Sequence, residues 1–262
     1  GNRVRYARAM QRWIEVADAV AATRSNSAKI AAVAAYLREL PPDALQPAVV
    51  FLSGRPFPER DARTTGLGWA ALAAAATAVT GSSGEDTGGL GAAYDRSSDL
   101  GTAVGDLFTA AGHTPTGTSP TVPETAAAFR AIAEARGAAG KTPILEDLFR
   151  RSTPDVARGI AKILSGELRI GLRGGHLEAA IAKAFERELA DVQWAGMLTG
   201  DIGRTAELAR DDALATAEMT LFHPLTCMLA SPAADEAEVL ARMAPPVWVE
   251  DKYDGIRAQL HR

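Results

Sequence analysis

The chain has 262 residues, of which 47% are hydrophobic, and its formal net charge at pH 7 is −4. This length suffices for a sizeable core, either in one large domain or in one domain followed by part of another. The single cysteine, Cys227, excludes an intramolecular disulfide and a cysteine-cluster metal site, and the four histidines are dispersed, so we expect no zinc site. No apolar run is long enough to span a membrane and no leader pattern is found, so we expect a cytoplasmic protein.

Hydrophobic residues recur at helical spacing through most of the first 217 residues. We expect helices over residues 4–23, 25–40, 42–52, 67–79, 94–111, 123–136, 153–165, 177–189, 191–198 and 202–217, and a further helix that begins at 142. Residues 81–91 and 112–123 are rich in Gly, Ser, Thr or Pro and are expected to be loops. The predicted fold class is therefore mainly all-α.

Several residues mark where the helices begin and end. Ser25 or Ser27 is expected to cap the second helix, and Thr153 to cap the helix that Gly166 ends. The glycines within residues 137–140 are expected to terminate the helix before them.

Two further expectations concern burial. Trp69 begins an alanine-rich apolar segment, so we expect it in the core. Arg158 and Lys162 lie four residues apart and are expected on the helix face opposite its buried stripe.

The composition changes after Phe222, where several prolines precede a β-prone segment. Val247–Val249 and residues 256–260 are expected to form two short strands joined by a turn at Asp254-Gly255. We therefore predict a helical domain over residues 1–219 and the truncated start of a mixed α/β unit over residues 220–262.

Basic residues concentrate in one stretch although the whole chain is acidic. Residues 150–173 contain six basic side chains (150, 151, 158, 162, 169 and 173) against two acidic ones (155 and 167), and Arg3, Arg5, Arg8 and Arg12 lie near the N-terminus. Such a stretch suits phosphate contacts, although basic runs are often only solvated helix faces.

The loop within this stretch carries the pattern of an anion-binding turn. Gly171, Gly174 and Gly175 permit close approach to the backbone, and a helix that begins near His176 offers unpaired amide groups flanked by Arg169 and Arg173. Such a loop can hold a phosphodiester without reading its sequence. The alternative is a plain glycine-rich connection between helices.

A candidate nucleophile lies near the end of the sequence, in Glu250-Asp251-Lys252-Tyr253-Asp254-Gly255-Ile256-Arg257. On an extended strand Glu250 and Lys252 point to the same side. Lys252 is suited to attack the α-phosphorus of a nucleotide if nearby cations or burial lower its pKa. Arg257 is a candidate for the ribose or phosphate, and Glu250 for a base amino group. The alternative is an exposed polar hairpin turn.

Three motifs occur in the order typical of one enzyme family. Residues 250–261 resemble the lysine motif of covalent nucleotidyltransferases, in the form found in ATP-dependent DNA ligases. Residues 224–230 (PLTCMLA) resemble the segment that opens the adenylation domain of those enzymes, and residues 166–173 (GELRIGLR) resemble a segment of their helical DNA-binding domain. A weaker likeness runs from Ala17 through Trp69.

The resemblance implies a catalytic Lys252 that is adenylated by ATP with Mg²⁺, in an ATP-grasp-like domain that begins near residue 220. It implies that the protein is a monomer that binds nicked duplex DNA of any sequence. It also implies a role in DNA repair, replication or recombination. By resemblance, Arg24, Ser25 and Lys29 contact the DNA backbone beside Arg169, Gly171, Arg173 and Gly174. Later motifs and an OB-fold of that family are absent, so we expect the chain to bind duplex DNA without ligating.

Three other hypotheses remain open from the sequence. The chain is alternatively a duplex-DNA-binding module without catalytic ancestry, or a helical interaction scaffold. Other covalent nucleotidyltransferases, such as RNA ligases, share the lysine motif, although they generally lack the helical region.

Overall fold

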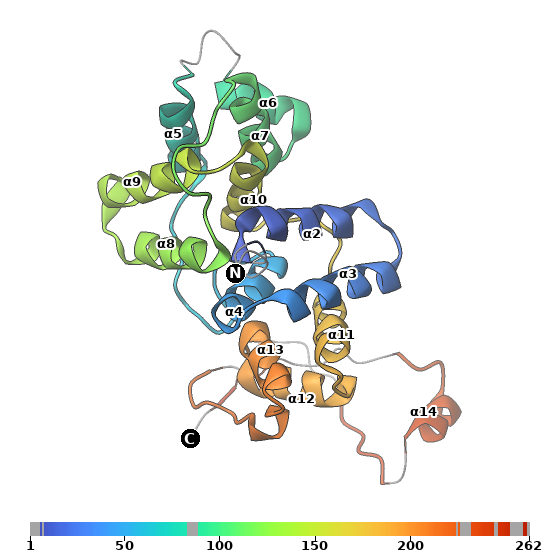
Figure 1. Cartoon of the computed structure of the whole chain (residues 1–262). Helices are drawn as coiled ribbons and strands as arrows, with labels where there is room; N and C mark the ends of the chain where they lie inside the picture. The colour runs from blue at the N-terminus through green and yellow to red at the C-terminus, as the bar shows by residue number, and fades with distance from the viewer. Residues whose placement is uncertain are drawn as a thin grey trace.

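The computed structural model describes residues 6, 8–82, 89–223, 225, 232–243, 246–251 and 259–260. Within these ranges the regular structure is helical and no strand is formed (Figure 1). The α-helices are α2 (Met10–Ala22), α3 (Asn26–Glu39), α4 (Pro42–Leu52), α5 (Trp69–Thr80), α6 (Gly89–Ser97), α7 (Leu100–Ala110), α8 (Val122–Glu134), α9 (Gly137–Arg150), α10 (Pro154–Ser165), α11 (Gly174–Phe185), α12 (Leu189–Thr199), α13 (Ile202–Arg210) and α14 (Glu236–Arg242), with a 3₁₀ turn at Leu214–Thr216. The prediction of a mainly all-α fold is confirmed.

Local sequence signals set many of the helix ends. The Ser25 hydroxyl accepts a hydrogen bond from the Ala28 amide at the start of α3, and Thr153 caps α10 through the Val156 amide, as predicted. Gly166 ends α10 with a φ of +71°, a left-handed conformation that glycine adopts without strain.

The helices form two groups around one continuous hydrophobic core. The first group, α5 to α10, occupies the upper and left part of Figure 1, and α3, α4, α11, α12 and α13 form the lower group. Helix α2 packs against α3, α8 and α10, and α4 packs against α13 and α8, so both connect the two groups. Trp13 on α2 and Phe51 on α4 are fully buried at this junction, with ring centroids 6.3 Å apart.

Glycines allow α7 and α10 to pack closely. Gly101 and Gly105 lie one turn apart on α7, and a Cβ atom on Gly101 would lie 2.8 Å from the carbonyl oxygen of Arg158 and also against Lys162. The same crossing contains an ion pair, because Lys162 Nζ donates to Asp99 Oδ2 at 2.6 Å. Burial raises the pKa of Asp99, but hydrogen bonds from Lys162 and Thr102 outweigh it, so this pKa lies below its ordinary value.

Arg158 also points to a neighbouring helix. It forms a bidentate pair with Asp18 on α2, with N–O distances of 3.0 and 2.7 Å. Arg158 and Lys162 were predicted on the face opposite the buried stripe of their helix, but that face packs against α7. Asp18 and Asp99 come from distant segments that helical spacing alone does not reveal, whereas Arg158 also pairs with Asp155 on its own helix.

Replacing Gly159 by alanine is expected to destabilise the protein. An added Cβ would overlap Ile14 Cδ1 and lie 3.7 Å from the Trp13 ring. Overpacking of this kind costs about 1–3 kcal/mol, which exceeds the gain of about 1 kcal/mol in helix propensity. Thermal unfolding followed by circular dichroism measures the effect. Gly91→Ala on α6 is the control, because nothing lies within 4 Å of its Cβ position; equal stability of the two variants would contradict the packing described.

Several helix boundaries differ from prediction; for example, α13 ends at Arg210 rather than at residue 217, and α6 begins at Gly89, inside the loop predicted over 81–91. Residues 94–111 form parts of two helices rather than one, because Ser98 adopts a φ of +50° and Asp99 then caps α7 through the Thr102 amide. Helix α8 ends at Glu134, before residues 137–140 as predicted, but α9 begins already at Gly137 and not at 142. Pro143 lies inside α9, in its second turn, where its missing N–H leaves the carbonyl group of Ala139 without the usual helical hydrogen bond.

Trp69 is also not in the core, as had been predicted. It is 42% exposed at the start of α5, and its ring packs edge-on against Tyr94 at a centroid distance of 4.9 Å. The buried positions of α5 are Leu72, Ala75 and Ala76, one turn farther along.

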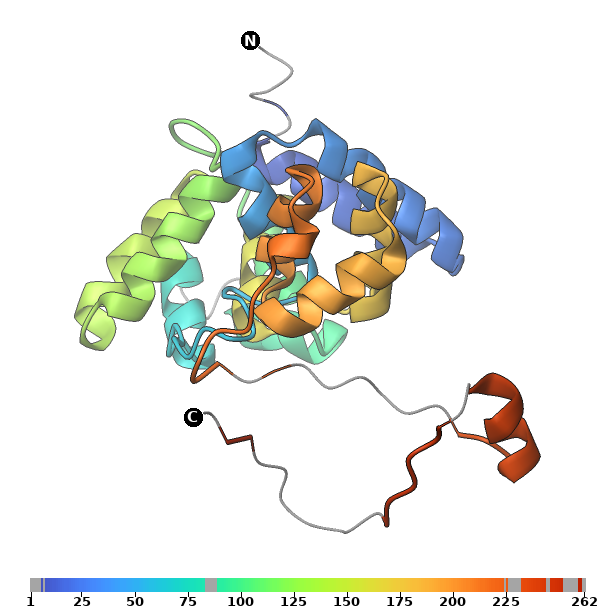
Figure 2. The same cartoon turned by 90° about the horizontal axis from the view of Figure 1, so that it is seen from below.

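The core ends before the C-terminal segment begins. Leu214 is the last core residue among those described, and α14 contains no buried residue. Figure 2 shows α14 standing away from the helical body. The predicted strand at Val247–Val249 is not formed, and residues 256–258 of the second predicted strand lie outside the described residues. In the described ranges no helix is both long and apolar enough to cross a membrane.

Candidate nucleic-acid interface

The loop between α10 and α11 exposes alternate residues. Leu168 and Ile170 are buried at 6% and 8% exposure and anchor the loop to the core. The residues beside these anchors are exposed: Arg169 lies between them, and Gly171 and Arg173 follow Ile170. Arg169 and Gly171 have φ values of +50° and +65°, so the loop turns sharply at both positions. The loop therefore presents the predicted contact residues outward.

The N-terminus of α11 continues this surface. Gly174 and Gly175 are exposed, and a Cβ atom at either position would meet nothing within 4 Å. In the described part of the chain, no acceptor is hydrogen-bonded to their amide N–H groups. The Arg173 amide instead donates to His176 Nδ1 at 3.2 Å. Free amides at the positive end of a helix favour a bound anion.

The N-terminus of α3 is joined to the same loop. Arg24 and Ser25 are exposed at this end of α3, whereas Lys29 in its first turn is buried. Lys29 Nζ donates to the carbonyl oxygens of Ile170 and Gly171, each at 3.0 Å. The structure therefore brings together residues 24–29 and 169–174, the two segments that the sequence proposed for the DNA backbone.

Ion pairs reduce the local positive charge that was counted from the sequence. Five of the six basic residues between 150 and 173 contact carboxylates: Arg150, Arg151, Arg158, Lys162 and Arg169. Within the described ranges, Arg173 has no such partner. The Arg169 partner, Glu167, is exposed, so solvent screens this pair and a phosphate can compete with it.

A pocket of about 490 Å³ lies beside the first turn of α11. Its walls come from residues 53–59, from Gly174 to Glu178, from α12 and from the start of α13. Three of its lining residues are the carboxylates Glu59, Glu178 and Asp201. Arg55 also lines the pocket and pairs with Glu59, and Arg60 lies 3.5 Å from Asp201, so two of the three negative charges are paired. Gly174 and Gly175 line the pocket as well, so it borders the arginine-bearing loop.

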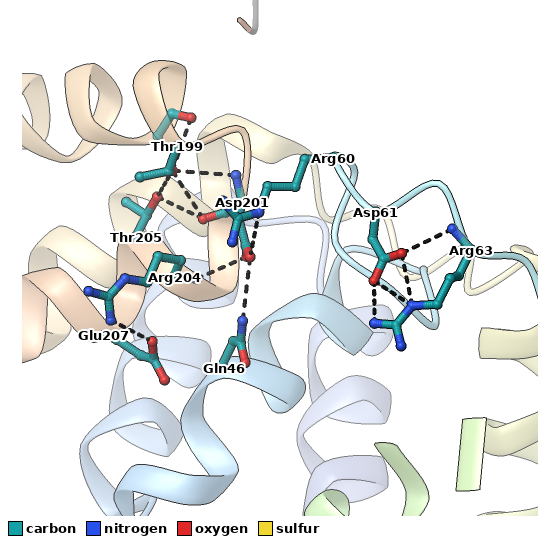
Figure 3. Close-up of polar contacts among 10 residues, drawn as sticks. Gln46, Arg60, Asp61, Arg63, Thr199, Asp201, Arg204, Thr205 and Glu207 are labelled. Atoms are coloured by element: carbon teal, nitrogen blue, oxygen red, sulfur yellow. Dashed lines mark hydrogen bonds and ion pairs between the residues drawn. The ribbon is translucent and has the colours of Figure 1, made fainter. Parts of the chain in front are cut away.

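Asp201 fixes one wall of this pocket (Figure 3). Its carboxylate caps α13 through the Arg204 amide at 2.9 Å and accepts a hydrogen bond from Gln46 Nε2 at 3.4 Å. Arg60 Nε lies 3.5 Å from the same carboxylate. These contacts attach α13 to α4 and to the segment that follows α4.

The segment after α4 is held by a second carboxylate, Asp61. Arg63 donates to both of its oxygens, with the shortest distance 2.6 Å (Figure 3). This hydrogen bonding, despite partial burial, holds the pKa of Asp61 below its usual range. The Arg63 amide also donates to Asp61 Oδ1 at 3.0 Å, so these contacts close a local turn between residues 61 and 63.

Replacing Asp201 by alanine is expected to destabilise the protein by about 2–4 kcal/mol, because a helix cap is lost and partly buried donors on Gln46 and Arg60 lose their acceptor. The side chain is only 1% exposed, so water cannot replace these bonds. Urea unfolding measures the change in the free energy of unfolding. Asp211→Ala removes an aspartate that pairs only with its neighbour Arg210 at the surface, and little change is expected there. Equal midpoints for the two variants would contradict the role of Asp201.

The predicted nucleotide-binding residues are described only in part. Lys252 and Arg257 lie outside the described residues, and Glu250 is exposed in a segment without regular structure. The sequence did not single out Asp201 or Arg60. The capping role of Asp201 could have been predicted, because an aspartate before an apolar periodic segment is a typical helix start. Its contacts with Gln46 and Arg60 could not, because these residues are distant in sequence.

The all-α fold defines the structural class, and comparison with known proteins gives the family. The family described as DNA ligase N terminus matches residues 10–182, which is well over half of the chain. The chain therefore belongs to this DNA ligase family.

Individual DNA ligases are similar to almost the whole chain. A probable DNA ligase from Koribacter versatilis is 43% identical over 254 residues, which cover 96% of this chain and 43% of that protein. A probable DNA ligase from Opitutus terrae is 34% identical, over 96% of this chain and 31% of that protein. A DNA ligase from Methanocella arvoryzae is 32% identical, over 95% of this chain and 45% of that protein. The chain thus spans less than half the length of these relatives.

Proposed function

We propose that this chain is the N-terminal part of an ATP-dependent DNA ligase. Residues 1–219 bind duplex DNA, and residues 220–262 begin the adenylation domain that carries the nucleophile. The observation that carries the proposal is the match to the DNA ligase N-terminal family, over a region that includes both α3 and the loop before α11. The end of the buried core at Leu214 supports the boundary near residue 220.

The DNA-binding surface consists of the outward-facing residues of two segments. Arg24 and Ser25 precede α3, and Arg169, Gly171, Arg173 and Gly174 lie in and after the loop. Arginines and free amides contact phosphate oxygens, and such contacts carry no sequence information. This suits a protein that must act at a nick of any sequence. We place the protein in the cytoplasm, acting as a monomer.

The chemical step belongs to Lys252. Its neutral amine attacks the α-phosphorus of ATP, so a nitrogen–phosphorus bond forms, the bond to pyrophosphate breaks and the amine loses a proton. Glu250 and Arg257 contact the nucleotide. Mg²⁺ would compensate charge on the phosphates. In the described ranges, no group of three or more His, Cys, Asp or Glu residues is placed to hold it. We expect this segment alone not to seal nicks.

Fluorescence anisotropy with labelled nicked, intact and single-stranded DNA tests the binding half of the proposal. We expect binding to both duplexes, and the logarithm of the affinity is expected to fall linearly with the logarithm of salt concentration, because bound counterions are released. The absence of duplex binding at low salt would refute the assignment of residues 1–219. Sealing of a nick by this segment with ATP and Mg²⁺ would refute the expected inactivity.

A further inference from the structure

Lys29 is a buried cation whose hydrogen bonds are directed at the loop rather than at solvent. It is 7% exposed, and it donates to the carbonyl oxygens of Ile170 and Gly171, which lie 141 and 142 residues away in sequence. An ammonium group has three donors, and the loop carbonyls accept from two of them. Because Lys29 is buried behind the loop, a phosphate that approaches from solvent contacts the loop first.

The shape of the loop and the position of Lys29 depend on each other. Gly171 has a φ of +65°, and a Cβ atom there would lie 2.6 Å from Lys29 Nζ. A buried ammonium without hydrogen-bond acceptors is unfavourable, so the lysine requires the carbonyls to face inward. With those carbonyls turned inward, Arg169 and Arg173 are the exposed side chains on either side of Gly171.

The positive charge of Lys29 is not cancelled by its partners. Both acceptors are neutral carbonyl groups, and among the described residues no carboxylate forms an ion pair with Lys29. A net positive charge therefore lies directly behind the loop. Charges in partly buried positions are screened less by salt than exposed ones.

A similar arrangement occurs elsewhere in the chain. Lys141, in the second turn of α9, donates to the carbonyl oxygen of Thr65 at 2.7 Å. A Cβ atom on Gly66, whose φ is +58°, would lie 2.9 Å from this Nζ. Gly66-Leu67 precedes α5 as Gly171-Leu172 precedes α11. The repetition indicates that a lysine of this kind serves the loop conformation.

We propose that Lys29 is a positioning residue for the DNA-binding surface: it holds residues 168–173 in the shape that presents Arg169 and Arg173, and it does not contact the phosphate itself. The inference rests on the proposed function, in which this loop binds duplex DNA. It replaces the direct backbone contact that the family resemblance suggested for Lys29.

The test combines DNA affinity with loop exchange. Lys29→Met, Arg173→Ala and the double variant are titrated with labelled nicked duplex at several salt concentrations, after circular dichroism shows that each is folded. Lys29→Met is expected to weaken binding about 10-fold, the effect of a lost hydrogen-bond network to a charge. Arg173→Ala is expected to weaken binding about 10-fold in the wild-type background but about 3-fold or less beside Lys29→Met, because residues that act as a unit are not additive.

In the Lys29→Met variant, hydrogen–deuterium exchange of residues 168–173 is expected to be faster than in the wild type.

The control is Arg38→Met, which removes one exposed positive charge from the other end of α3; an affinity change below about 2-fold is expected there, as for a distant screened charge. Independent losses for Lys29→Met and Arg173→Ala, with unchanged loop exchange, would make Lys29 a direct contact and overturn the inference. Unchanged affinity for Lys29→Met would also overturn it. Failure of the wild-type chain to bind duplex would instead refute the proposed function.

Gly171→Ala provides a second test if Lys29→Met does not fold. Its Cβ displaces the ammonium without removing the charge. We expect a similar loss of affinity and a similar increase in loop exchange. Wild-type affinity in a folded Gly171→Ala variant would overturn the inference.

Discussion

Replacing Lys252 by alanine is expected to abolish covalent labelling with ATP, in a polypeptide that carries this segment together with the rest of a DNA ligase. The amine is the only atom that forms the bond to phosphorus in the proposed step. Removing a covalent nucleophile lowers the rate by more than about 10⁴-fold. Incubation with ATP radiolabelled at the α-phosphate, followed by denaturing electrophoresis, measures the labelled protein.

Lys183→Ala serves as the control for this loss. Lys183 is an exposed lysine on α11, outside the lysine motif, so its replacement removes the same side chain without removing the proposed nucleophile. We expect its labelling to equal that of the wild type. Persistent label in the Lys252→Ala protein would contradict the assignment of the nucleophile.

Replacing both Arg169 and Arg173 by alanine is expected to weaken duplex binding about 100-fold, since a hydrogen bond to a charged group contributes about 10-fold for each arginine. Two phosphate contacts would also be lost. The slope of log affinity against log salt concentration is therefore expected to become less steep by roughly 0.9 per contact. Anisotropy titrations over a salt series measure both quantities.

The matched control removes two arginines from the other group of helices. Arg96 on α6 and Arg130 on α8 are exposed and equal in charge to the pair in the loop. The double change Arg96→Ala with Arg130→Ala is expected to alter the affinity by less than about 2-fold through net charge alone. If both double variants lost affinity equally, the loop would have no special role.

The sequence predicted the features that depend on neighbouring residues. Ser25, Thr153 and Gly166 set helix ends through bonds within one turn, so their roles follow from residue type and position. The choice of Arg169, Gly171, Arg173 and Gly174 as contact residues came from the glycines of the loop and from the family resemblance, and the structure shows that all four are exposed. These signals were sufficient to predict a mainly helical protein with a glycine-rich loop before the helix that begins near His176.

The sequence did not predict features that depend on distant partners. Lys162 and Arg158 were counted as free positive charge, but Lys162 pairs with Asp99 at the start of α7 and Arg158 pairs with Asp18 on α2. The inward position of Lys29 depends on carbonyl groups about 140 residues away. Spacing along one helix carries no information about either arrangement.

Hydrogen–deuterium exchange of the chain with and without duplex DNA tests most directly whether the described surface binds the phosphate backbone. Binding there is expected to slow exchange at residues 24–29 and 167–176, while α8 and α6 exchange at unchanged rates. Protection confined to other helices, with no change in the loop before α11, would contradict the proposed DNA interface.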